Sequence, residues 1–234
     1  TVWRADITRD SWGSFFYIND KDLQTFYSPT FHPFDILPKN YTVNFSSHKA
    51  EFKRFDNGVE TISEIYVSPE DNVEIRTLTF ANHTQKNRPF EILSFQELAM
   101  APHLADLSHP VFNKMFIETE SIEPLHALIA FRRPRSAKEE PLFCFHLISC
   151  EHSIEQPFSF ETSREKFIGR GNTLGNPDAL NNQLTNSVGF VLDPIFSIKY
   201  KFIIEAKKKY KLSFVTGVAK SKAEALNLIK KYKE

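Results

Sequence analysis

The feature that most constrains this fold is a strict alternation of apolar and polar residues in short successive runs. Residues 51–56 and 59–67 alternate on either side of Asn57-Gly58. A period of two is typical of a strand with one buried face, and Asn-Gly tolerates the positive φ angles of a type I′ turn. The two runs therefore predict a β-hairpin.

The next run carries apolar residues on both of its faces. Along residues 73–80, Val73 and Ile75 point to one side, whereas Leu78 and Phe80 point to the other. A strand with two apolar faces is typical of the interior of a layered sheet protein. We therefore expect layers on both sides of this strand.

Further runs continue the pattern to the end of the chain, with 23 Phe in the composition favouring sheet. One helix is expected at 222–232, because Ser221 and Glu224 form a capping box. No βαβ alternation occurs, so we predict one domain over residues 1–234: mostly β, a large antiparallel sandwich with a short C-terminal helix. The other expected strands span 41–45, 90–98, 114–119, 125–132, 142–150, 187–192, 195–205 and 210–217.

Charge and composition exclude several classes of function. Lys plus Arg equals Asp plus Glu, 29 each, which argues against a nucleic-acid partner. No signal peptide and no run of 18 apolar residues is present, so we expect no membrane contact by this domain itself. The chain starts at Thr1, which leads us to expect a piece of a longer multidomain polypeptide.

The nucleophile and metal candidates are weak. Cys144 and His146 share one face of a predicted strand, which allows a dyad, although an ordinary buried thiol is the commoner arrangement. His103, Asp106 and His109 have a spacing that zinc could use, but Pro residues bracket the segment and we expect it to be irregular rather than helical. We therefore predict no catalytic residue, no metal and no cofactor.

A glycine- and arginine-rich loop at 163–180 has a composition that no core strand would show. It contains Arg164 and Arg170 together with Gly169, Gly171 and Gly175. Glycines let the backbone approach other groups closely, and arginines offer a planar fork of donors to hydroxyls and carboxylates. This loop either ties domains together or frames a polar ligand.

The N-terminal string places the two tryptophans of the chain beside four charged residues. Trp3 and Trp12 flank Arg4, Asp6, Arg9 and Asp10. Aromatic platforms and planar polar side chains are what carbohydrate sites use, although packing in the core is the commoner fate of Trp.

Taken together, a series of strings resembles the β-sandwich module of cyclic β-1,2-glucan synthases, whose non-membrane part is similar to cellobiose phosphorylase. The match runs in order along essentially the whole chain: WRADITRDSWGSFFYIND, FYSPTFHP, HKAEFKRFDNGVETISEIYVSPEDNVEIRTLTFANHTQKNRPFEI, HPVFNKMFIETE, FRRPRSAKEEP, SREKFIGRGNTLGNPDAL, VGFVLDPIFS and VTGVAKSKAEAL. The resemblance implies a galactose-mutarotase-like supersandwich. In the phosphorylases such a module precedes an (α/α)₆ barrel that holds the catalytic acid.

The resemblance also implies a role. It predicts a non-catalytic, carbohydrate-associated module that is inactive by itself and belongs to a glycosyltransferase with a phosphorylase-like region. The parent would be an inner-membrane protein, and this module would be exposed to the cytoplasm. Its partners would be a β-glucan or oligosaccharide and neighbouring domains, including the barrel. Where relatives are rich in Arg and Ala, this chain is rich in Lys, Asn and Phe. The candidate carbohydrate-binding residues are Trp3, Trp12, Arg132, Arg133, Arg164 and Arg170.

Two alternatives stay open at this point. The module could be a purely structural scaffold that docks other domains, because a fold does not imply a function. It could also be a stand-alone mutarotase-like enzyme, for which His103 and His146 are the candidate acids.

Overall fold

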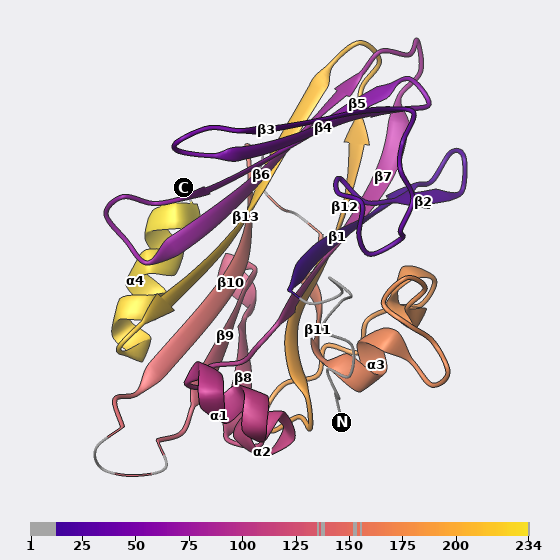
Figure 1. Ribbon diagram of the computed structural model, residues 1–234. Helices are drawn as coiled ribbons and strands as arrows, with labels where there is room; N and C mark the ends of the chain where they lie inside the picture. The colour runs from indigo at the N-terminus through magenta and orange to yellow at the C-terminus, as the bar shows by residue number, and fades with distance from the viewer. Residues whose placement is uncertain (1–12, 135, 137–138, 152–153, 155, 234) are drawn as a thin grey trace.

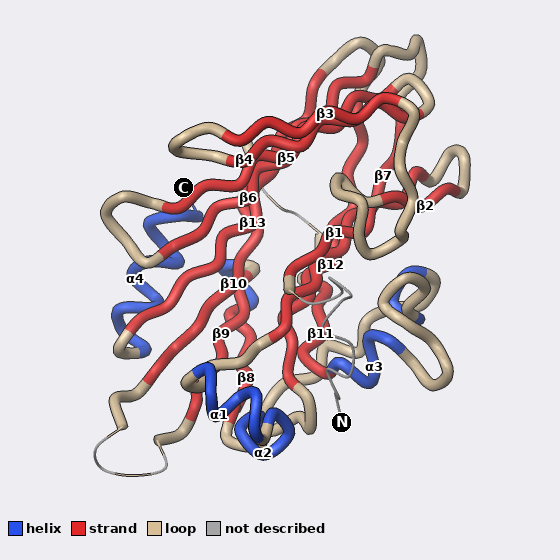
Figure 2. Tube along the Cα trace, viewed as in Figure 1, coloured by secondary structure: helices blue, strands red, loops and turns tan. Residues whose placement is uncertain are grey.

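The chain folds into two antiparallel β-sheets that face each other (Figures 1 and 2). The structure is a computed structural model that describes residues 13–134, 136, 139–151, 154 and 156–233. Its strands are β1 Ser14–Asp20, β2 Thr25–Tyr27, β3 Asn40–Phe45, β4 Ala50–Asp56, β5 Val59–Val67, β6 Val73–Asn82, β7 Arg88–Glu97, β8 Ile117–Ile122, β9 Ala127–Arg132, β10 Leu142–Cys150, β11 Ser159–Ser163, β12 Pro194–Ile204 and β13 Lys209–Ala219. Its helices are α1 His103–Ser108, α2 Pro110–Lys114, α3 Arg164–Ile168 and α4 Lys222–Lys233, with 3₁₀ turns at Glu123–Leu125 and Asp178–Leu180.

The two sheets differ in size. The smaller has five strands in the order β11-β12-β7-β1-β2, and the larger has eight in the order β3-β4-β5-β6-β13-β10-β9-β8. The predicted hairpin joins β4 to β5, with Asp56 opposite Val59. Asn57 has φ +48° and Gly58 has φ +82°, the left-handed pair that a two-residue turn of this kind requires.

The main core lies between the sheets. It contains Phe16 and Ile18 from β1 and Leu78 and Phe80 from β6. The opposite face of β6 carries Val73 and Ile75 into a second cluster under α4, so the prediction of two apolar faces is confirmed. The Ser221 half of the capping box of α4 is confirmed, because the Glu224 N–H donates to Ser221 Oγ (3.1 Å), and the Glu224 carboxylate accepts from the Lys220 N–H (2.9 Å).

A third apolar cluster lies on the outer face of the five-stranded sheet. Phe15 and Tyr17 of β1, with Leu93 and Phe95 of β7, pack there against Phe167 of α3. Residues 164–184 thus form a cover over this sheet (Figure 1, at the right). β1 is buried on both faces, so its sequence shows no alternation, and this is why it was not predicted.

Three local predictions were wrong. The 101–113 segment, expected to be irregular, contains α1 and the start of α2, in which Pro110 occupies the first helical position that proline tolerates. Lys114 ends α2, so the strand expected from residue 114 begins only at Ile117. Residues 187–192 form no named strand and make only an isolated bridge, between Thr119 and Gly189.

Candidate functional site

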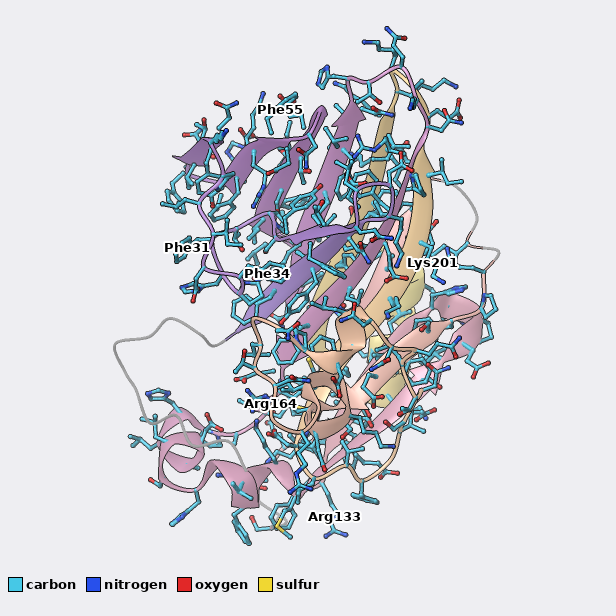
Figure 3. All side chains as sticks on the ribbon, turned by 90° about the vertical axis from the view of Figure 1, so that its right-hand side faces the viewer. Phe31, Phe34, Phe55, Arg133, Arg164 and Lys201 are labelled. Carbon is cyan, nitrogen blue, oxygen red and sulfur yellow. The ribbon has the colours of Figure 1, made fainter. Side chains whose placement is uncertain are left out.

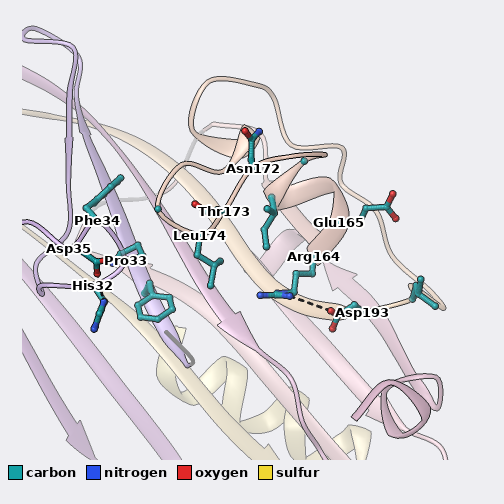
Figure 4. Close-up of a pocket in the computed structure, with 15 residues that line it drawn as sticks. His32, Pro33, Phe34, Asp35, Arg164, Glu165, Asn172, Thr173, Leu174 and Asp193 are labelled. Atoms are coloured by element: carbon teal, nitrogen blue, oxygen red, sulfur yellow. Dashed lines mark hydrogen bonds and ion pairs between the residues drawn. The ribbon is translucent and has the colours of Figure 1, made fainter. Parts of the chain in front are cut away.

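A cleft of about 790 Å³ opens where the cover meets the loop that follows β2 (Figure 4). Three parts of the chain line it: Phe15 of β1, the His32–Asp35 loop and the segment that begins at Arg164. Its lining mixes apolar and polar groups: Phe15, His32, Pro33, Phe34, Asp35, Arg164, Glu165, Ile168, Gly169, Asn172, Thr173, Leu174, Gly175, Leu192 and Asp193.

Arg164 is the cation of this cleft, and two carboxylates hold it. Its Nη1 lies 3.7 Å from Asp193 Oδ2, and its Nη2 lies 3.5 Å from Glu97 Oε1. The Arg164 N–H also donates to the Asp193 carbonyl (3.0 Å), while the buried Lys114 Nζ donates to Asp193 Oδ1 (2.6 Å). Within the described residues, the buried Nε of Arg164 has no hydrogen-bond partner. The two ion pairs therefore orient the guanidinium at the cleft.

The opposite wall is the short loop after β2. His32 Nδ1 and Asp35 Oδ1 are 2.6 Å apart, and the Phe34 ring meets Tyr17 edge-on with centroids 5.6 Å apart. Tyr17 donates its hydroxyl to the Leu174 carbonyl (2.8 Å), which ties the cover to β1. Burial raises the pKa of Tyr17, so its hydroxyl stays protonated as this bond requires.

Two glycines allow the cover to bend into the cleft. Gly169 ends α3 with φ +81°, and a Cβ there would collide with the Asp178 carboxylate. Asp178 accepts a hydrogen bond from Asn172 Nδ2 (2.6 Å), which connects the loop after α3 to the 3₁₀ turn at Asp178–Leu180. A Cβ on Gly175 would lie 3.2 Å from the Pro33 carbonyl, which shows how closely the two walls approach.

The arrangement is better suited to binding a ligand than to catalysing a reaction on it. A fixed guanidinium, carboxamide and hydroxyl groups beside Phe15 and Phe34 match the hydroxyls and the apolar faces of a neutral polar ligand. The Asp193 carboxylate is already engaged by two cations, Lys114 and Arg164. Among the described residues, no group of three or more His, Cys, Asp or Glu could hold a metal ion.

Of the four predicted residues that the structure describes, Arg164 alone lies at this cleft. Arg132 ends β9 in the larger sheet, is buried, and pairs with Glu139 (3.2 Å). Arg133 lies over the Phe116 ring, 5.8 Å from its centroid. Arg170 is exposed on the turn after α3 and is not among the residues that line the cleft. Trp3 and Trp12 lie outside the described residues.

The packed-strand interpretation of Cys144 agrees with its surroundings. Burial raises the pKa of the Cys144 thiol to about 12 and lowers the pKa of His146 to about 3, so neither would carry charge at neutral pH. His146 bonds to Ser94 and Thr216 between the sheets, whereas His103 is exposed on α1. Mutarotation would need one such histidine beside a Glu base at an open site, and His146 is buried between the sheets.

Sequence reasoning missed most of the cleft. Phe15 lies in a strand that was not predicted, and the His32–Asp35 loop, with Asp35 as its one carboxylate, was not among the predicted sites. Asp193 stands beside Pro194 in the string that continues the glycine- and arginine-rich loop, and that position was the one available signal. None of the helices in the described part of the chain has both the length and the apolar character that crossing a membrane requires.

The fold defines the class of this protein as an antiparallel β-supersandwich domain. The chain belongs to the glycosyl hydrolase 94 supersandwich domain family, whose model matches residues 1–234. The sequence-based prediction of this kind of module is thereby confirmed.

Individual relatives are much longer than this chain. Over its whole length it is 29% identical to the cyclic beta-(1,2)-glucan synthase NdvB of Rhizobium meliloti (strain 1021), of which it covers 8%. It is 20% identical, over 93% of its length, to the solabiose phosphorylase of Paenibacillus borealis, of which it covers 27%. A solved polysaccharide lyase shares the fold, with a TM-score of 0.51, 8% identity, and coverage of 93% of this chain and 27% of that one.

Proposed function

We propose that this chain is a non-catalytic, carbohydrate-associated module of a larger polypeptide resembling the cyclic β-1,2-glucan synthases, and that a neutral glucan chain contacts it at the Arg164 cleft. The observation that carries the proposal is the cleft itself. It combines the apolar Phe15 and Phe34 with a guanidinium held by Glu97 and Asp193. Such a surface meets both the C–H face and the hydroxyls of a sugar ring.

The wider context follows from the relatives. One of them is a cyclic beta-(1,2)-glucan synthase and another a solabiose phosphorylase, and both are several times longer than this chain. The partners of the module would then be a β-glucan and neighbouring domains, including an (α/α)₆ barrel. The module would face the cytoplasm from an inner-membrane protein, and the isolated domain would turn over no saccharide.

A titration of the 234-residue chain with linear β-1,2-linked glucan oligosaccharides tests the proposal. We expect backbone amide shifts in two-dimensional NMR spectra around Phe34, Arg164 and Asn172. Arg164→Ala should weaken the affinity measured by calorimetry at least about tenfold, because a hydrogen bond from a charged donor contributes about 1.5–3 kcal/mol. Arg164→Lys should retain part of the affinity through its charge.

Arg170→Ala is the matched control, because Arg170 is exposed in the same loop but does not line the cleft. It should bind as the unmodified protein does. Trp12→Ala, in the same titration, tests one of the two aromatic candidates, Trp3 and Trp12. Absence of shifts at the cleft would contradict the proposal, and so would equal affinities for the Arg164 and Arg170 variants.

A structural scaffold is the second candidate, and one observation favours it. Four apolar side chains on and just after the α1–α2 pair are 45–77% exposed: Leu104, Leu107, Phe112 and Met115. Such a patch is typical of a docking surface for another protein surface. If glucan does not bind, replacing these residues by Ser in a longer polypeptide that includes the following domain should separate the two domains in limited proteolysis.

A further inference from the structure

A second cleft, of about 590 Å³, lies on the other side of the cover. We call it the lysine cleft. Its lining includes Lys21, Glu91, Lys199 and Lys201 from the five-stranded sheet and its edges. The end of the cover and the residues just after it add Asn181, Asn182, Gln183, Leu184 and Asn186. Figure 3 shows Lys201 and Arg164 at separate places on this side of the molecule. The two clefts share no lining residue.

The centre of the lysine cleft is a buried carboxylate surrounded by three ammonium groups. Glu91 is 3% exposed, and its oxygens lie 3.4 Å from Lys21 Nζ and 3.9 Å from the Nζ atoms of Lys199 and Lys201. The sum of these charges is +2, so the carboxylate does not neutralise the cations. Burial lowers the pKa of Lys199, and repulsion from Lys21 and Lys201 adds to this shift.

The three lysines differ in the contacts that their ammonium groups already make. Lys199 donates to the carbonyls of Ala179 and Asn182, both at 2.8 Å, and so holds the cover in place. Among the described residues, the ammonium groups of Lys21 and Lys201 contact Glu91 alone, Lys21 through a long hydrogen bond (3.4 Å), and the two side chains are 43% and 70% exposed. These two ammonium groups retain donors that can turn toward a ligand.

The walls of the lysine cleft are rigid and partly polar. Gln156 pairs with the backbone of Lys201 through both its amide nitrogen (2.7 Å) and its oxygen (3.1 Å). Asn186 likewise accepts from the Phe160 N–H (2.9 Å). The side chains of Asn181 and Gln183, by contrast, are exposed at the cleft and can donate to and accept from hydroxyls.

We propose that the lysine cleft binds an anionic sugar, with its phosphate or carboxylate between Lys21 and Lys201 and its hydroxyls at Asn181 and Gln183. The net charge of +2 favours an anionic group on the ligand, and the exposed carboxamides of Asn181 and Gln183 favour a sugar, whose hydroxyls they can bond. The site does not depend on the neutral-glucan contact at the Arg164 cleft.

The probes are glucose 6-phosphate, glucuronate, inorganic phosphate and glucose, added separately to the 234-residue chain and followed by NMR and calorimetry. We expect the first two to shift amides of Lys21, Glu91 and Lys201, and glucose to leave them unchanged. Binding as tight for inorganic phosphate as for glucose 6-phosphate would overturn the sugar part of the proposal. Equal binding of glucose and glucose 6-phosphate would overturn the anion part. Affinity should fall as salt is raised, because exposed charges are screened.

Variants with opposite expected effects distinguish binding from mere stability. Lys21→Gln with Lys201→Gln should weaken glucose 6-phosphate binding at least tenfold. Glu91→Gln should strengthen it, because it removes the one negative charge at the centre of the cleft. The matched control is Lys211→Gln with Lys230→Gln, which removes two exposed lysines from β13 and α4.

The control pair should bind the probe as the unmodified protein does. Unchanged affinity in the Lys21 and Lys201 double variant, or weaker binding by a Glu91→Gln protein that unfolds at the normal temperature, would overturn the proposal. Amide shifts at Arg164 with neutral glucan report on the proposed function alone, so the two hypotheses can fail separately.

Discussion

His146 makes the stability of this domain depend on pH. The imidazole is 3% exposed and lies between the two sheets, stacked with the Phe196 ring (centroids 6.0 Å apart) and with the Phe214 ring (centroids 5.6 Å apart). Burial lowers its pKa from 6.5 to about 3, with the charge of Arg76 as a smaller cause. The folded protein therefore keeps this ring neutral at any pH above about 3.

The hydrogen bonds around His146 fit one neutral tautomer. Ser94 Oγ accepts from the Ile198 N–H (3.0 Å), so its own proton is available to His146 Nε2 (2.9 Å). Thr216 donates to Gln96 Oε1 (2.8 Å), so it accepts from His146 Nδ1–H (2.8 Å). We infer from this network that Nδ1 carries the proton. A second proton on Nε2 would have to displace the Ser94 bond.

The sign and size of the effect follow from linkage. Between pH 6.5 and about 3, the unfolded chain binds a proton at residue 146 that the folded chain does not, so stability is complete above 6.5 and falls as pH decreases. Each pKa unit corresponds to about 1.4 kcal/mol, so lowering the pH from 7 to 5 should cost about 2 kcal/mol. That is a large share of the roughly 5–15 kcal/mol typical of a domain.

Urea unfolding at several pH values, compared between the unmodified protein and His146→Gln, measures this contribution. Gln can donate to Thr216 and accept from Ser94 but does not titrate, and the other histidines contribute equally to both proteins. The variant should lose about 2 kcal/mol less than the unmodified protein from pH 7 to 5. Parallel pH curves would refute the reasoning. If the variant does not fold, imidazole nitrogen shifts that show protonation of His146 near pH 6 would refute it instead.

Two further predictions concern the cover and the thiols. Gly169→Ala should lower the free energy of unfolding by about 2–4 kcal/mol, because it combines strain at φ +81° with a collision against Asp178. The control is Gly171→Ala, at φ +82° with open space around it, which should lower the free energy of unfolding by only about 1 kcal/mol in the same urea titration. Equal losses in the two variants would contradict the collision. Cys144 should resist a thiol reagent at pH 8 in the native protein, because burial raises its pKa to about 12. It should react once denaturant is added. Modification of Cys144 in the native protein at the rate of an exposed cysteine would show that the core opens.

The sequence determined those parts of the structure that depend on local patterning. The Asn57-Gly58 turn, the two-faced strand at Val73–Asn82 and the capped helix at Lys222–Lys233 all follow from turn chemistry, side-chain periodicity and capping. The family was also predictable from the sequence, because many strings typical of it occur in the same order along the whole chain.

Only the tertiary structure decided the sites. β1 could not be identified from alternation because both of its faces are buried, and it contributes Phe15 to the cleft. Arg164, Glu97 and Asp193 are far apart in sequence and meet because α3 begins beside the end of β7 and the start of β12. Glu91 and its three lysines come together in the same way, across β7, β12 and the turn after β1. Antiparallel pairing brings distant residues into register through long-range contacts, and no local pattern records which residues will face one another.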